Sequence, residues 1–164
     1  VANSGVACSL GGGSVLSMGG GGGQSPLFWY TGSGAGSMNR SVRGYSTSWN
    51  RIVAQDGALE LAGPLTTAGA SSYPFALSGT ADTGTNTVSG EIGDGMGTIS
   101  LRLLSTAPQG GTAEDGYWQL TGLNTYKDNT SIDNGRTLVI FWSAQLVSGR
   151  YAGTISHNTP ATFQ

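Results

Sequence analysis

The chain has 164 residues, of which 29 are glycine, and its 7 basic and 9 acidic residues leave a formal charge of −2. This length is enough for one domain with a buried core, while the single lysine excludes the basic surface that nucleic-acid binding requires. So much glycine also excludes a helical protein, because each interior glycine costs about 1 kcal/mol relative to alanine. The low fraction of charged residues, 10%, favours a secreted or particle-surface protein.

Residues 1–25 are rich in glycine and include a run of five glycines at positions 19–23. Such a run is entropically costly to hold in one conformation, so we expect this segment to be partly flexible. Cys8 is the only cysteine, which excludes an internal disulfide and predicts a small buried apolar side chain, with an intermolecular bridge as the alternative. No run is apolar and long enough to suggest membrane insertion.

Strand signals begin after this segment. Residues 27–30, Leu-Phe-Trp-Tyr, predict an aromatic strand, and residues 43–53 place Tyr, Thr and Trp at alternate positions. Asp56-Gly57 then precedes residues 58–61. This dipeptide between two strand-like runs is typical of a β-hairpin.

The second half continues the same pattern. Strand signals cover residues 73–77, 87–92, 97–104, 117–123, 137–147 and 150–156. Hairpin turns are predicted at Gly93-Asp94-Gly95, Asn134-Gly135 and Ser148-Gly149. No window has the period of an amphipathic helix. We therefore expect one all-β domain over residues 1–164, an antiparallel β-sandwich of nine to eleven strands with immunoglobulin-like or jelly-roll topology. The sequence shows no internal repeat, which argues against a propeller or solenoid.

Candidate chemistry is sparse in this sequence. His157 is the only histidine, so the usual zinc ligand sets are excluded, and we expect no metal and no cofactor. Most carboxylates fall in turns, where they bond to the local backbone. Glu60 and Glu91 fall in or against strands, and a two-carboxylate glycosidase could use them. The main prediction is that the protein is not an enzyme, and a glycan-active enzyme is one alternative.

Aromatic and amide side chains near turns suggest a ligand-binding surface. Sugar sites on β-proteins combine flat aromatic faces with polar groups that bond to hydroxyls. The candidate ligand-binding residues are Trp29, Tyr30, Trp49, Asn50, Arg51, Tyr126 and Asp128. Their alternate spacing is equally consistent with aromatic residues that form the core.

One stretch resembles a known family. Residues 134–138, Asn-Gly-Arg-Thr-Leu, continue through Ala144-Gln145-Leu146 to residues 149–154, Gly-Arg-Tyr-Ala-Gly-Thr. This arrangement is similar to the last two strands of chaperone–usher fimbrial subunits. The resemblance covers only this part of the chain, and Cys8 has no partner for the disulfide that many such subunits carry. The resemblance implies an immunoglobulin-like fold and a role in fimbrial attachment.

We therefore predict a non-enzymatic, secreted binding module that acts in cell adhesion, either a fimbrial tip or a lectin-like domain. Its partner would be a glycan or a host-surface receptor, bound by side chains on a rigid sheet scaffold. The alternative is a structural subunit of a pilus, phage or virus particle, with neighbouring subunits as its partners.

Overall fold

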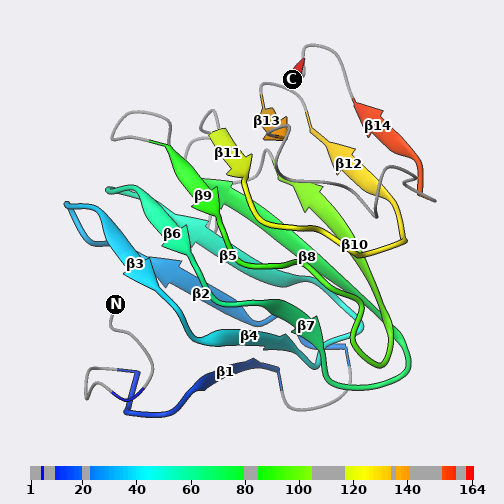
Figure 1. The fold of residues 1–164 in the computed structure, drawn as a ribbon, viewed down its shortest axis with the longest axis horizontal. Coiled ribbons are helices and arrows are strands. Elements are labelled where there is room, and N and C mark those ends of the chain that lie inside the picture. Colours follow the sequence, from blue (N-terminus) through cyan, green and yellow to red (C-terminus); the bar gives the residue numbers. More distant parts are fainter. Residues whose placement is uncertain are drawn as a thin grey trace.

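The computed structural model describes residues 5, 10–19, 23–79, 85–104, 117–133, 136–140, 153–157 and 162–164. These residues form a parallel β-solenoid of about four turns, in which each turn of the chain lies on the one before (Figure 1). All pairings between its strands are parallel. The predicted all-β class is confirmed. The predicted antiparallel sandwich, whether immunoglobulin-like or jelly-roll, is wrong.

Three sheets form the sides of the solenoid. Sheet A contains β1 (Val15–Met18), β4 (Ser41–Gly44) and β7 (Leu65–Thr67). Sheet B contains β2 (Leu27–Tyr30), β5 (Asn50–Ala54), β8 (Ser72–Gly79), β10 (Thr98–Leu103), β12 (Thr130–Ile132) and β14 (Ile155–His157). Sheet C contains β3 (Gly36–Met38), β6 (Leu59–Leu61), β9 (Asn86–Val88), β11 (Tyr117–Leu120), β13 (Thr137–Ile140) and β15 (Thr162–Phe163).

The chain visits the three sheets in a fixed order. Three turns place one strand in each sheet, and the fourth joins sheet A only by a bridge between Ile92 and Leu65. One turn of the solenoid leads from Leu27 to its neighbour Arg51, and the next leads from Asn50 to its neighbour Phe75. The later strands extend sheets B and C alone.

Alternating side chains fill the interior and stack in ladders from turn to turn. The ladders are Phe28, Ile52, Leu77, Leu103 and Ile132 on sheet B, Met38, Leu61, Val88, Leu120 and Ile140 on sheet C, and Leu16, Val42, Leu65 and Ile92 on sheet A. Most of these side chains are fully buried. Full burial of such a side chain stabilises the fold by about 1.5–3 kcal/mol.

The corner between sheets C and A contains a glycine on three successive turns, at Gly63, Gly90 and Gly122. A Cβ atom on Gly90 would lie 2.1 Å from the carbonyl oxygen of Gly63, and one on Gly122 would lie 2.3 Å from that of Gly90. The backbones are therefore too close for a side chain. Each glycine follows an apolar residue and one intervening position: Leu61-Ala62-Gly63, Val88-Ser89-Gly90 and Leu120-Thr121-Gly122. This short pattern is the internal repeat that the sequence analysis missed.

Arg40 occupies the same corner one turn earlier. A Cβ atom on Gly63 would lie 2.1 Å from the carbonyl oxygen of Arg40. This is the same close approach that a Cβ atom on Gly90 would make to Gly63. The side chain of Arg40 is only 1% exposed, and its guanidinium donates to the carbonyl oxygens of Leu10 and Gly11. Arg40 thus joins the segment before β1 to the start of the glycine stack.

The predicted strand at residues 27–30 is confirmed as β2, but the hairpins are wrong. Asp56-Gly57 connects β5 to β6, which belong to different sheets, and Gly93-Asp94-Gly95 leads from the bridge at Ile92 to β10. The predicted turns at residues 134–135 and 148–149, and Cys8, lie outside the described residues. The described residues contain no helix that could cross a membrane.

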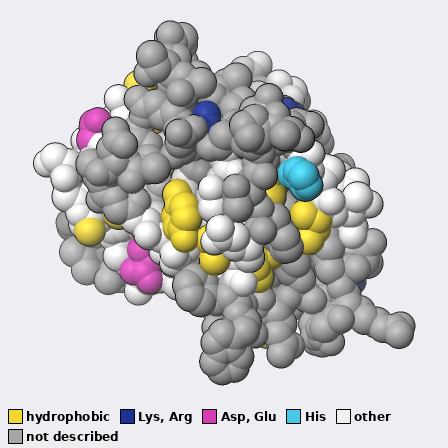
Figure 2. Space-filling model, turned by 90° about the horizontal axis from the view of Figure 1, so that it is seen from above, with side chains coloured by type: hydrophobic (Ala, Val, Ile, Leu, Met, Phe, Trp, Pro, Cys, Tyr) yellow, Lys and Arg dark blue, Asp and Glu magenta, His cyan; other side chains and the backbone are white. Residues whose placement is uncertain are grey.

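The later strands lie at one end of the solenoid, which Figure 2 views from above. Hydrophobic side chains are visible in the middle of this end, between areas that are not described. The last strands here are β14 in sheet B and β15 in sheet C.

Candidate functional site

Two of the predicted site residues point into the solenoid. Asn50 is fully buried, and its Nδ2 donates to the carbonyl oxygens of Ser46 at 2.9 Å and Pro74 at 3.1 Å. Tyr126 is also fully buried, and its hydroxyl is 2.7 Å from Oγ1 of Thr130. Both side chains satisfy polar groups of the interior and are out of reach of a surface ligand.

Tyr30 and Asp128 support turns. The Tyr30 hydroxyl donates to the Gly34 carbonyl oxygen at 2.6 Å, and a Cβ atom on Gly32 would lie 2.4 Å from that hydroxyl. Asp128 accepts at Oδ1 from the Asn129 backbone N–H at 2.8 Å and at Oδ2 from the Ser72 hydroxyl at 3.2 Å. Neither residue joins the other candidates.

The remaining three candidates share the outer face of sheet B. Phe28 and Tyr30 pack against the core, so Trp29 between them points outward, where it is 40% exposed. On the next turn Trp49 and Arg51 are half-buried, and Val53 lies beside Trp29. Alternate residues of a strand are about 7 Å apart, so the row from Trp49 to Val53 is about 13 Å long. We call Trp29, Trp49 and Arg51 the tryptophan strip; Val53 is only 3% exposed and is not part of it.

Trp49 is held in place by a residue two turns away. The Arg102 guanidinium carbon lies 5.3 Å from the centre of the Trp49 ring, which is a cation–π contact. Ala76 lies between Arg51 and Arg102 on the strand that separates them. The side chain of Ala76 is a single methyl group, so Arg102 can reach across β8 to Trp49.

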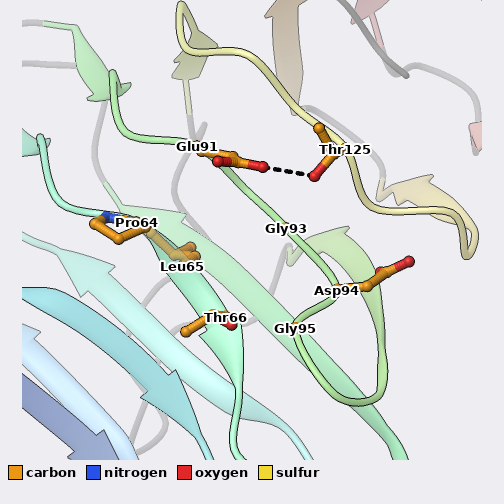
Figure 3. A pocket seen from close by; sticks show the side chains of 8 residues that line it. All are labelled: Pro64, Leu65, Thr66, Glu91, Gly93, Asp94, Gly95 and Thr125. Carbon is orange, nitrogen blue, oxygen red and sulfur yellow. Dashed lines mark hydrogen bonds between the residues drawn. The ribbon is translucent and has the colours of Figure 1, made fainter. Parts of the chain in front are cut away.

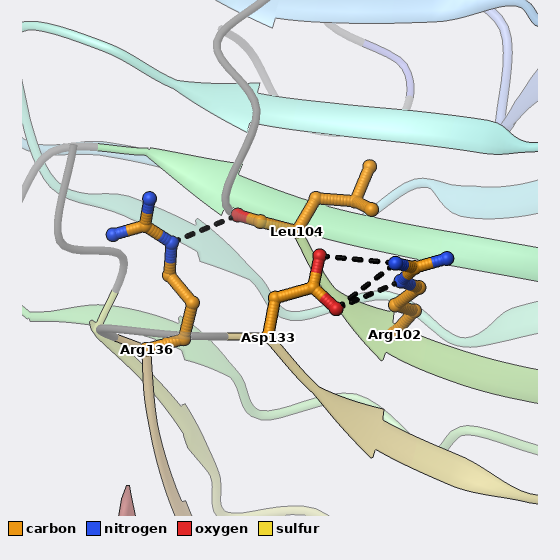
Figure 4. Close-up of polar contacts among 4 residues, drawn as sticks. All are labelled: Arg102, Leu104, Asp133 and Arg136. Atoms are coloured by element: carbon orange, nitrogen blue, oxygen red, sulfur yellow. Dashed lines mark hydrogen bonds and ion pairs between the residues drawn. The ribbon is translucent and has the colours of Figure 1, made fainter. Parts of the chain in front are cut away.

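Arg102 is itself fixed by Asp133, as Figure 4 shows. Its Nε and Nη2 donate to Oδ1 of Asp133 at 3.1 and 3.0 Å, and Nη2 also donates to Oδ2 at 3.1 Å. Nearby, Nε of Arg136 donates to the Leu104 carbonyl oxygen at 3.0 Å. The tryptophan strip is therefore preorganised by an ion pair that spans successive strands of sheet B.

Sequence reasoning missed Arg102 and Asp133 as parts of this surface. Arg102 falls within the predicted strand at residues 97–104, but its partners Trp49 and Asp133 lie far from it on either side in the sequence. A period equal to one turn of the solenoid would have placed Arg51, Ala76 and Arg102 in one outward row. That period was the missing signal.

A second candidate site is a hollow of about 290 Å³ on the outside of sheet A, drawn in Figure 3. Its lining residues come from three successive turns: Pro64, Leu65, Thr66, Glu91, Gly93, Asp94, Gly95 and Thr125. Thr125 donates from Oγ1 to Oε1 of Glu91 at 2.7 Å across one side of the hollow. We call this hollow the sheet A groove.

Glycine creates the sheet A groove. Leu65 and Ile92 point inward and lie side by side, so Thr66 and Gly93, which follow them, both face outward. The Thr125 backbone N–H donates to the Ile92 carbonyl oxygen at 2.8 Å, so Thr125 lies on the other side of Gly93. The outward row on these three turns is therefore Thr66, Gly93 and Thr125, so its middle position has no side chain. Gly93-Asp94-Gly95, predicted as a hairpin turn, instead lines this groove.

The two carboxylates considered for a glycosidase each bond to a hydroxyl. Glu60 accepts from Ser89 at Oε1 at 2.7 Å. Hydrogen bonds from Ser89 and then from Ser37 lower the pKa of Glu60 below its usual value of 4.5. Glu91 bonds to Thr125 instead. Within the described ranges, no three His, Cys, Asp or Glu side chains are grouped as metal ligands.

The chain matches no protein-family model, and it is not significantly similar to any curated protein or solved structure with which it was compared. The resemblance to fimbrial subunits is not tested by these comparisons. Most of the residues that carry it, 134–135 and 141–152, lie outside the described residues.

Proposed function

We propose that this protein is a non-enzymatic extracellular binding module, of adhesin or lectin-like type, that binds carbohydrate through the tryptophan strip. The observation that carries the proposal is the outward pair Trp29 and Trp49 on one rigid sheet face. Trp29 is 40% exposed although the residues on either side of it, Phe28 and Tyr30, pack against the core. An exposed tryptophan on a flat sheet offers the apolar surface on which a sugar ring can stack.

Preorganisation supports the same proposal. A ligand that binds a side chain already fixed in place loses less conformational entropy than one that must order it. Arg102 holds the Trp49 ring, and Asp133 holds Arg102 in a bidentate ion pair. Solenoids also present extended surfaces for recognition, because each turn adds a row of side chains to the same face.

A glycan array with purified protein tests this proposal. Trp29→Ala should weaken binding about tenfold, which corresponds to about 1.4 kcal/mol. Tyr45→Ala is the matched control, because Tyr45 is an aromatic residue of nearly equal exposure, 41%, that follows β4 in sheet A. Equal losses from both substitutions, or no glycan bound by the parent protein, would contradict the proposal.

Asp133→Asn tests the preorganisation separately. This change removes the charge that fixes Arg102 and leaves Trp29 and Trp49 in the sequence. We expect glycan binding to fall threefold to fivefold, with a larger unfavourable entropy in calorimetry. Unchanged affinity would show that the Trp49–Arg102 contact does not contribute to binding.

A second candidate function is that of a subunit in an assembly. The observation that favours it is the group of hydrophobic side chains visible in Figure 2 at the end where sheets B and C reach β14 and β15. Edge strands pair readily with a neighbouring chain. Light scattering across a range of protein concentrations tests this alternative. A constant monomer mass would exclude self-assembly, and growth in mass would favour it.

A further inference from the structure

We infer that the sheet A groove is a second binding site, and that its ligand is one sugar ring with a positively charged amino group. The groove lies outside sheet A, whereas the tryptophan strip lies outside sheet B. This inference therefore does not depend on the proposed function, and either can fail without the other.

The shape of the groove limits the size of the ligand. Its volume of about 290 Å³ lies at the lower limit of small-molecule sites, which span about 300–1,000 Å³. Gly93 forms the floor, between the outward Thr66 and Thr125 of the neighbouring turns. Neighbouring parallel strands are about 4.8 Å apart. The backbones of Thr66 and Thr125, two turns apart, are therefore separated by about 10 Å. A hollow of this volume suits a ligand of about one ring.

The polar groups of the groove select for hydroxyl and ammonium donors. Glu91 accepts from Thr125 at Oε1, and no described residue donates to its Oε2. That oxygen is able to accept a bond from a ligand. The hydroxyls of Thr66 and Thr125 can both donate and accept, as the ring hydroxyls of a sugar require.

Charge determines which sugar is favoured. The eight lining residues include two carboxylates, Glu91 and Asp94, and no cationic side chain. Oδ1 of Asp94 accepts from the backbone N–H groups of Ile99 at 2.9 Å and Lys127 at 3.3 Å, and its side chain is directed away from the hollow, so Glu91 supplies the carboxylate beside Gly93 and Thr125 (Figure 3). A charge-assisted bond from an ammonium to a carboxylate is about twice as strong as a neutral one. An amino sugar is therefore favoured over a neutral or an acidic sugar.

The test is a titration followed by heteronuclear NMR, with glucosamine, N-acetylglucosamine, glucuronic acid and ethanolamine as separate probes. We expect glucosamine to bind with Kd on the order of 1 mM, as for a shallow site, and to shift the amide signals of Gly93, Gly95 and Thr125. N-acetylglucosamine should bind at least fivefold more weakly, because its nitrogen is neutral. Equal binding of ethanolamine would overturn the inference of a sugar ring, and equal binding of glucuronic acid would overturn the charge argument.

Two substitutions, each with a matched control, test the location. Glu91→Gln should weaken glucosamine binding at least fivefold, whereas Glu60→Gln, which alters a carboxylate outside the groove, should not. Gly93→Ala should abolish binding, because its Cβ atom would lie 3.0 Å from Oε1 of Glu91 and 3.1 Å from Oγ1 of Thr125. Gly34→Ala is the control, with no atom within 4 Å of its Cβ.

Two-dimensional spectra of each variant establish that it is folded. Glu91→Gln leaves the backbone and the side-chain volume almost unchanged, so it tests the site even if Gly93→Ala does not fold. Undiminished glucosamine binding by Glu91→Gln would overturn the inference. Binding by all variants, with shifts at Trp29 rather than Gly93, would place the ligand on the tryptophan strip instead.

Discussion

The corner between sheets C and A and the outer face of sheet B are built from the same turns but have opposite sequence rules. At the corner, three successive turns have glycine, because each backbone lies against the carbonyl group of the turn before. On the outer face the equivalent row reads Leu27, Arg51, Ala76, Arg102 and Ser131, so side chains of different size and polarity follow one another. Stacking therefore constrains the corner, whereas the outer face is able to vary and to carry recognition.

The largest expected effect comes from a side chain placed in the glycine stack. Gly90→Ala would put a Cβ atom 2.1 Å from the Gly63 carbonyl oxygen, and the atoms in its way belong to the backbone. The turns must then separate, and we expect the free energy of unfolding to fall by about 3 kcal/mol. Urea denaturation followed by circular dichroism measures this loss.

Gly34→Ala is the control for that substitution. A Cβ atom there has no neighbour within 4 Å, so stability should change by less than about 0.5 kcal/mol. If both variants lost equal stability, the close approach of backbones at the corner would not explain the glycine at position 90.

Arg40 sharpens the comparison, because it is a large side chain at the same corner. It is tolerated there because its neighbour on the preceding side is the segment with Leu10 and Gly11, to which its guanidinium donates. Arg40→Ala leaves those two carbonyl groups without these donors and should cost about 2 kcal/mol. Hydrogen exchange should show the loss first in β1, which pairs with the adjacent β4.

Arg40→Lys separates charge from geometry. Lysine retains the positive charge, but it lacks the planar guanidinium that reaches two carbonyl groups at once. We expect it to recover less than half of the lost stability. Faster exchange spread evenly over all turns, rather than concentrated in β1, would contradict a role for Arg40 at this end of the stack.

The same comparison explains how much of the fold could be predicted from the sequence. Alternation in each strand depends on local burial, so β2 and the alternating run that contains β10 were recognisable. The partner of a strand was not recognisable, because alternate burial is the same in a sandwich and in a solenoid. The apolar-x-Gly pattern at Gly63, Gly90 and Gly122 distinguishes the two folds, but its unequal spacing hides it as a regular repeat.

The candidate site was predictable only in part, for a related reason. Trp29, Trp49 and Arg51 lie near one another in the sequence or on adjacent turns, and the structure brings them to one face. Asn50 and Tyr126 were predicted on the same ground, as amide or aromatic residues near turns, but their side chains bond to buried polar groups. A sequence pattern identifies residues that alternate between the two faces of a strand. Which of these faces lies outside the solenoid is decided by the way the chain winds.

The smallest expected effect is on the outer face of sheet C, where Glu60 is partly exposed to solvent. Its hydrogen bonds from Ser89 and Ser37 lower its pKa in the folded protein, so the carboxylate contributes stability above its usual pKa of 4.5. This contribution is lost as the pH falls through the lower, folded pKa. Because solvent reaches the carboxylate and screens these bonds, we expect only a few tenths of a kcal/mol.

Ser89→Ala removes the larger of the two causes and should move the pKa of Glu60 back toward 4.5. NMR titration of the Glu60 side chain measures this movement directly, and denaturation at pH 3 and pH 7 measures its effect on stability. The destabilisation by Ser89→Ala should be greater at pH 7 than at pH 3, since only the ionised carboxylate gains from the bond. A shift confined to Glu60, with no change at the adjacent Gly90, would show that outer-face contacts act independently of the glycine stack.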